Sequence, residues 1–150
     1  MSAAHAMPRL LGPLQKAVRL GGAVRNGAPV LRDGVLEQRR GLRVRRVALR
    51  DAAVELVPGR PRRLSLRAGT VEVELLRVWP GGGRSRSPDE LEALAAALGP
   101  AAAPVAEALR AQAAHLRGEL GLPDFSPLAA YVGRSGTRLG DLGEGIGSLP

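Results

Sequence analysis

The fold of this chain is decided by residues 35–79, which read VLEQRRGLRVRRVALRDAAVELVPGRPRRLSLRAGTVEVELLRVW. Through most of this stretch Leu or Val alternates with Arg or Glu. A period of two is typical of a strand that has one buried face and one face in water. The pattern therefore predicts an antiparallel β-meander that contains most of the arginines of the first half.

Turn signals divide the stretch into strands. Asp33-Gly34 lies between short apolar runs, and Asp-Gly is a strong hairpin signal because both turn positions need a positive φ. Pro58-Gly59-Arg60-Pro61 and Ala68-Gly69 give two further turns. The alternation shifts by one residue at Arg45-Arg46, which predicts a β-bulge. We expect four to five strands over about residues 29–79.

Helix signals follow the strands. Pro80-Gly81-Gly82-Gly83 is expected to end the sheet. Ser87-Pro88-Asp89-Glu90 then combines a Ser cap, an early Pro and a Glu three residues after the cap, which predicts a helix start. Further apolar stripes predict a second helix over about 104–120 and a short third one from 126 to 132. The predicted fold class is α+β, with two or three amphipathic helices over about 88–132.

One predicted pairing decides how the arginines are used. A hairpin of residues 62–68 with residues 70–76 places basic side chains of one strand beside acidic side chains of the other, which stabilises the pair. The residues are Arg63, Ser65 and Arg67 on the first strand and Thr70, Glu72 and Glu74 on the second. The arginines left for an anionic partner form the candidate binding site: Arg39, Arg40, Arg43, Arg45, Arg46 and Arg50.

Charge is distributed unevenly along the 150 residues. Residues 1–75 hold fifteen basic and six acidic residues, a net charge of +9, whereas residues 76–150 hold seven and eight, a net charge of −1. Lys16 is the only lysine beside 21 arginines. Coding bias in a GC-rich gene is an alternative explanation for that preference, because Gly, Ala and Pro are also abundant.

The chain is expected to form one domain at residues 29–132. Residues 1–28 are interpreted as a flexible basic leader, or alternatively as a mitochondrial presequence, and residues 133–150 as a flexible glycine-rich tail. No stretch approaches the roughly 20 apolar residues that would span a bilayer. We therefore expect a soluble intracellular protein, cytoplasmic or nuclear, with the mitochondrial matrix as the alternative.

Residues that carry chemistry are sparse. The chain has no cysteine and two widely separated histidines, His5 and His115, which predicts neither a zinc site nor a catalytic triad. The loop at residues 81–86 lies where a phosphate-binding loop would be, but Asp89 and Glu90 already occupy the start of the helix, so a linker is favoured. Ser87 is read as a helix cap, with phosphorylation as the alternative. We predict no catalytic residue, cofactor or metal.

These features favour a non-enzymatic binding, adaptor or assembly subunit. Its basic sheet face would dock on an anionic partner surface, and its helices would dock on another protein subunit. The predicted protein-interface residues are Leu91, Leu94, Leu98, Leu109 and Leu116. Alternatively, these helices simply cover the sheet.

Two other function classes stay open. One is binding to the backbone of RNA or DNA within a ribonucleoprotein or chromatin-type complex. Sequence-specific recognition of single strands is disfavoured because residues 1–78 contain no aromatic residue on which bases could stack. The other is a small enzyme of unknown reaction.

Overall fold

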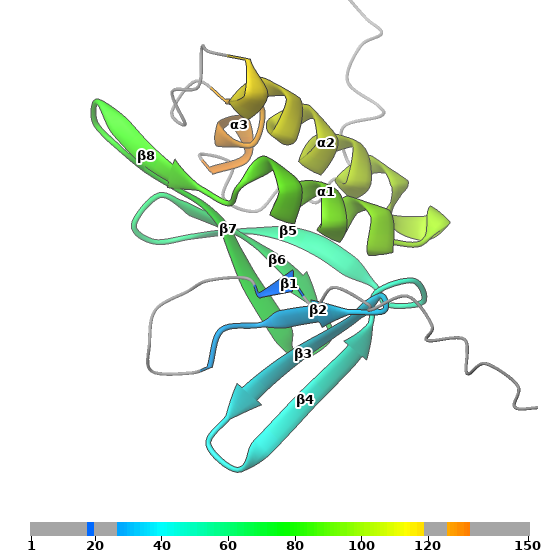
Figure 1. Ribbon diagram of the computed structural model, residues 1–150. Coiled ribbons are helices and arrows are strands. Elements are labelled where there is room, and N and C mark those ends of the chain that lie inside the picture. The colour runs from blue at the N-terminus through cyan, green and yellow to red at the C-terminus, as the bar shows by residue number, and fades with distance from the viewer. Residues whose placement is uncertain (1–17, 20–26, 119–125, 133–150) are drawn as a thin grey trace, which may run out of the picture.

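The computed structural model describes residues 18–19, 27–118 and 126–132, and its architecture is α+β with strands first and helices second (Figure 1). This confirms the predicted fold class. The described residues form two antiparallel sheets of four strands each instead of a single meander of four or five. Sheet one contains β1 (Val18–Arg19), β2 (Val30–Arg32), β3 (Val35–Arg40) and β4 (Arg43–Ala48). Sheet two contains β5 (Val54–Gly59), β6 (Arg63–Ala68), β7 (Val71–Trp79) and β8 (Gly82–Ser85).

Local turn chemistry explains the hairpins. Asp33 (φ 52°) and Gly34 (φ 74°) join β2 to β3 with both turn residues in the left-handed region, as the Asp-Gly pair predicts. Gly69 (φ 55°) begins the turn between β6 and β7. Both predicted hairpins are thus confirmed.

The helices follow as α1 (Pro88–Ala97), a 3-10 turn (Pro100–Ala102), α2 (Ala103–Arg117) and the short α3 (Ala129–Val132). The predicted cap of α1 is present as a complete capping box. The backbone N–H of Glu90 donates to Ser87 Oγ at 3.3 Å, and the Ser87 N–H donates to Glu90 Oε2 at 3.0 Å. These reciprocal hydrogen bonds satisfy two backbone groups at the helix start, which explains why the helix begins here.

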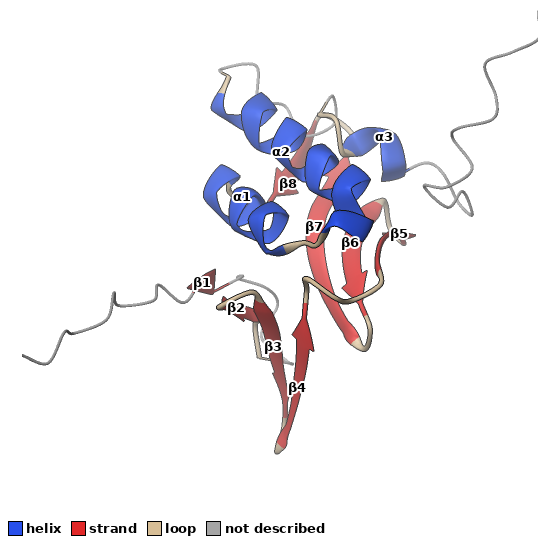
Figure 2. Ribbon diagram, turned by 90° about the vertical axis from the view of Figure 1, so that its right-hand side faces the viewer, coloured by secondary structure: helices blue, strands red, loops and turns tan. Residues whose placement is uncertain are grey.

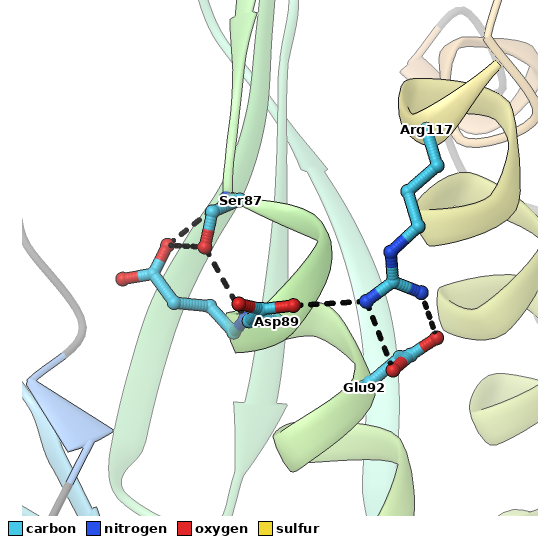
Figure 3. Close-up of polar contacts among 5 residues, drawn as sticks. Ser87, Asp89, Glu92 and Arg117 are labelled. Carbon is cyan, nitrogen blue, oxygen red and sulfur yellow. Dashed lines mark hydrogen bonds and ion pairs between the residues drawn. The ribbon is translucent and has the colours of Figure 1, made fainter.

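Charged contacts at the surface link α1 to α2. Figure 3 shows the Arg117 guanidinium between the carboxylates of Asp89 and Glu92. Its Nη2 lies 2.9 Å from Asp89 Oδ1, and the contact with Glu92 is bidentate. The hydrogen bond from Arg117 lowers the pKa of Glu92 below its ordinary value.

The two long helices pack on sheet two and complete one hydrophobic core. Leu64, Leu66 and Val73 of the sheet are fully buried in the same cluster as the helix leucines. Gln112 of α2 is also fully buried; its Nε2 donates to Ser85 Oγ of β8 at 3.2 Å, and its Oε1 accepts from the Leu128 N–H at 3.0 Å. This side chain ties the helix layer to the edge of the sheet and to the segment that precedes α3.

The helix leucines that the sequence assigned to a protein interface lie in this core. Leu91, Leu94 and Leu109 are 0% exposed, and Leu98 and Leu116 are partly buried against them. The expectation of an external interface is therefore corrected: the apolar stripes of α1 and α2 cover the chain's own sheet. The alternative interpretation, that the helices simply cover the sheet, accounts for these residues.

The bulge lies in a different hairpin from the one predicted. β3 pairs with β4 without interruption through Arg45 and Arg46. The irregularity falls between β6 and β7, where Leu64 pairs with Leu76 but Ser65 pairs with Glu74, so Leu75 is the extra residue. Buried Arg86 supports this irregular backbone: its Nε donates to Glu74 O at 2.7 Å and its N–H to Leu75 O at 2.9 Å. Burial lowers the pKa of Arg86, and the Glu90 carboxylate opposes this effect.

The glycine-rich segment that was expected to be a linker is part of the sheet. Gly82–Ser85 form β8, paired with β7 through a turn in which Gly81 has a φ of 75°. The expected tail at 133–150 and most of the expected leader lie outside the described residues, although Val18–Arg19 within the leader form β1. None of the helices in the described part of the chain has the length and apolar character that a bilayer crossing requires.

Candidate anion-binding arm

Five of the six arginines predicted to bind an anionic partner lie on one hairpin, residues 35–48, which we call the basic arm. It consists of β3, β4 and the connecting turn at Gly41 (φ 59°) and Leu42. Figures 1 and 2 show its tip projecting away from the helices. Its base is anchored, because Leu36 and Leu49 are fully buried and the Leu49 N–H donates to Gly34 O at 2.9 Å.

The strand register divides the arginines of the arm between its two faces. Residues directly opposite each other on paired strands point to the same side. Arg39 pairs with Val44, and Arg46 pairs with Glu37, so Arg39 and Arg46 share one face. The other face carries the remaining three arginines of the arm, which are Arg40, Arg43 and Arg45.

The expectation of a single basic sheet face is therefore wrong. The predicted bulge at Arg45-Arg46 would have brought these two neighbouring arginines to one side. Because β4 is regular there, Arg45 and Arg46 point in opposite directions. The arm is a ribbon with positive charge on both sides.

Intramolecular contacts engage only part of this charge. Arg46 Nε lies 2.9 Å from Glu37 Oε2, and Arg45 Nη1 donates to Thr70 O at 3.2 Å. Within the described ranges, no side-chain hydrogen bond or ion pair engages the other arginines of the arm, which are Arg39, Arg40 and Arg43. Glu37 is the only acid in residues 35–48, so the arm carries a net charge of +4.

Arg50 lies apart from the other five. It follows β4 at the base of the arm, where its backbone meets the end of the first helix. A Cβ atom added to Gly99 would lie 1.9 Å from Arg50 O, so only glycine fits this close approach. The Arg50 side chain is exposed, but it is not on the projecting ribbon.

The tip of the arm is apolar, which the sequence reasoning missed. The strand pattern assigned Leu42 and Val44 to the buried side, whereas the relative exposures are 104% for Leu42 and 41% for Val44. Leu42 occupies the hairpin turn, and Val44 lies on the outer face because the register is not shifted. The Gly41-Leu42 step between arginines was the signal that could have marked a turn.

The arm offers charge and a hydrophobic tip, and its single carboxylate, Glu37, is paired with Arg46. Across the described ranges, no set of three or more His, Cys, Asp or Glu side chains is grouped to hold a metal ion. The exposed arginines of the arm are suited to contact with an anion. Comparison with protein-family models, curated proteins and solved structures gave no match for this chain.

Proposed function

We propose that the protein is a non-enzymatic binding subunit that inserts its basic arm into a groove of an anionic macromolecule. The observation that supports this is the two-sided distribution of arginines on a projecting ribbon. Docking on a flat acidic surface would use charge on one side only. A ribbon with positive charge on both sides suits a groove whose two walls are negative.

A nucleic-acid duplex is the partner that this geometry favours. The major groove of B-form DNA admits a two-stranded β-ribbon, and phosphates line both of its walls. Arg39 would face one wall, while Arg40 and Arg43 would face the other. Contacts of this kind position a protein on the backbone and carry no sequence information.

A second candidate is an acidic protein partner within an assembly. The exposed apolar residues Leu42 and Val44 favour it, because an apolar centre with a charged rim is the usual anatomy of a protein interface. The leucines of α1 and α2 play no part in either candidate, since they are buried in the core.

The test is a binding titration of labelled mixed-sequence duplex DNA at low salt. The variant R40Q/R43Q should bind at least about tenfold more weakly, because two charge-assisted contacts are lost. The control variant R67Q/R110Q removes the same net charge from the body and should keep the wild-type affinity. Duplex RNA should bind more weakly than DNA, because its deep, narrow major groove does not admit a ribbon.

The same experiment separates the two candidates. Leu42→Ser should change duplex affinity little, since phosphate contacts dominate that interaction. Failure of the wild-type protein to bind duplex DNA at low salt would remove the nucleic-acid candidate. Loss of binding to an acidic protein partner on Leu42→Ser would then favour the second one.

A further inference from the structure

Three arginines lie side by side across sheet two, on strands outside the arm. Arg63 of β6 is the register partner of Arg77 of β7, and Arg77 is the register partner of Arg84 of β8. Neighbouring strands are about 4.8 Å apart, and register partners point to the same side. We call Arg63, Arg77 and Arg84 the arginine row.

The arginine row lies on the face of sheet two that the helices do not cover. Leu64 and Val78, which follow Arg63 and Arg77 in their strands, are buried on the opposite face. Ser85, next to Arg84, is hydrogen-bonded to Gln112 of α2 on that buried side. Arg77 and Arg84 are exposed on this face, whereas Arg63 is partly buried and its Nε is covered.

Another row on the same face shows how sheet two neutralises charge elsewhere. Glu55 of β5, Arg67 of β6 and Glu72 of β7 are also register partners, and here the sign of the charge alternates. Arg67 lies 3.3 Å from Glu55 and 3.5 Å from Glu72. In that row the positive charge of Arg67 is neutralised within the chain.

The charges of the arginine row are not all neutralised by carboxylates of the described residues. Arg77 has one carboxylate partner, Glu74 at 2.7 Å, and no carboxylate in the described part of the chain pairs with Arg63 or Arg84. Like charges directly opposite each other destabilise a strand pair. An anion bound from outside would remove this repulsion.

The surrounding turns add positive charge. Arg60 and Arg62 are exposed in the turn before β6, and a hydrogen bond of 2.9 Å from the Val78 N–H to Arg62 O holds that turn beside β7. Residues 58–64 and 76–86 contain no Asp or Glu. The end of sheet two formed by these turns and the β7–β8 hairpin is thus strongly basic, and Figure 1 shows it far from the tip of the arm.

Trp79 stands next to the arginine row. It lies two residues after Arg77 on the same face and pairs with Gly82 of β8. A Cβ atom at Gly82 would lie 2.7 Å from Trp79 Nε1, so the indole ring covers this glycine. The side chain is nevertheless 46% exposed, which leaves part of the ring available to a ligand.

We infer that this end of sheet two is a binding site for single-stranded nucleic acid, separate from the basic arm. Phosphates contact the arginine row, and a base stacks on the exposed part of Trp79. The combination carries the assignment, because sequence-tolerant binding of single strands uses a positive groove together with aromatic stacking. An acidic peptide would satisfy the charges but would make no use of the ring.

Trp79 is the only tryptophan in the chain, so its fluorescence reports on this site alone. The experiment titrates the full chain with single-stranded oligothymidylate at low salt, in parallel with inorganic polyphosphate and polyglutamate. Oligothymidylate should quench the tryptophan emission through stacking. The two polymers without bases should leave the emission nearly unchanged.

Variants locate the ligand. Arg84→Gln should lower the oligothymidylate affinity about tenfold, as expected for one lost charge-assisted contact. Arg110→Gln, which removes an exposed charge from α2, should leave it unchanged. The arm variant R40Q/R43Q should still show the quenching at saturating oligothymidylate, because Trp79 lies outside the arm, so this readout is independent of the proposed function of the arm. Circular dichroism should show that each variant is folded.

Three results would overturn the inference. The first is an unchanged tryptophan emission at saturating oligothymidylate. The second is equal quenching by oligothymidylate and by polyphosphate or polyglutamate, which would mean that no base stacks on the ring. The third is equal affinity of Arg84→Gln and Arg110→Gln, which would place the ligand elsewhere.

Discussion

The β3–β4 and β6–β7 hairpins are built from the same alternation of arginines with Leu and Val, yet they use their arginines differently. In sheet two, Arg67 is neutralised between Glu55 and Glu72. In the basic arm, Glu37 neutralises Arg46 alone. The reason is topological: β6 has a strand partner on each side of Arg67, whereas β4 is an edge strand and β2 pairs with β3 only as far as Glu37, so the tip of the arm has no third strand beside it. Whether a strand arginine is structural or free for a partner is therefore decided by its neighbours.

The largest expected effect comes from comparing one leucine of each hairpin. Leu66 in β6 is 0% exposed, so Leu66→Ala should cost about 2–5 kcal/mol in the free energy of unfolding through the cavity that it creates. Leu42→Ala at the tip of the arm should change this free energy by less than about 0.5 kcal/mol. Urea denaturation measures both values, and similar losses would mean that the tip is packed.

The connection between the base of the arm and the helices can be broken at Gly99. Gly99→Ala brings a Cβ atom against the rigid Arg50 backbone, and we expect a loss of about 1–3 kcal/mol or more. Gly118→Ala is the matched control, because its nearest atoms would lie at 3.6 and 3.7 Å. Thermal unfolding should show a clearly lower Tm for the first variant only; an unchanged Tm would refute the close approach.

A smaller effect separates the two classes of arginine. Arg67→Gln removes two exposed ion pairs and should cost a few tenths of a kcal/mol for each. Arg43→Gln removes no intramolecular pair and should leave the free energy of unfolding unchanged. The comparison would be contradicted if Arg43→Gln proved the more destabilising of the two.

The smallest expected effect is on the pH dependence of stability. Arg117 holds the pKa of Glu92 below its ordinary value in the folded state, so the contribution of this pair is present above the unfolded pKa and is lost as the pH falls through the folded one. In Arg117→Gln, acidification from about pH 6 to about pH 3 should therefore lower the stability slightly less than in the wild type. Denaturation curves at both pH values measure the difference; an identical acid sensitivity would show that the exposed pair contributes nothing.

The sequence predicted those features that depend on local chemistry. The Asp33-Gly34 turn and the Ser87 capping box are set by a few adjacent residues, and both are present. The β8 strand was missed because Gly82-Gly83 carries no apolar pattern, and its pairing is supplied by β7. The bulge at Leu75 was missed because it depends on which residues β6 places opposite it.

The candidate site was predicted only in part, because local sequence does not determine strand register or tertiary contacts. Counting arginines identified five residues of the arm, because they are close in sequence. Their distribution over two faces depends on the register of β3 with β4, and the separation of Arg50 depends on its contact with Gly99. The arginine row was not identified, since Arg63, Arg77 and Arg84 come together only through strand pairing.

The salt dependence of duplex DNA binding tests the role of the basic arm most directly. If Arg39, Arg40 and Arg43 each contact a phosphate, the logarithm of the binding constant should fall against the logarithm of the salt concentration with a slope of about −3. R40Q/R43Q should reduce this slope to about −1, while R67Q/R110Q should leave it unchanged. An equal slope for both variants would contradict the account, because it would mean that the arginines of the arm are no freer for a partner than those of the body.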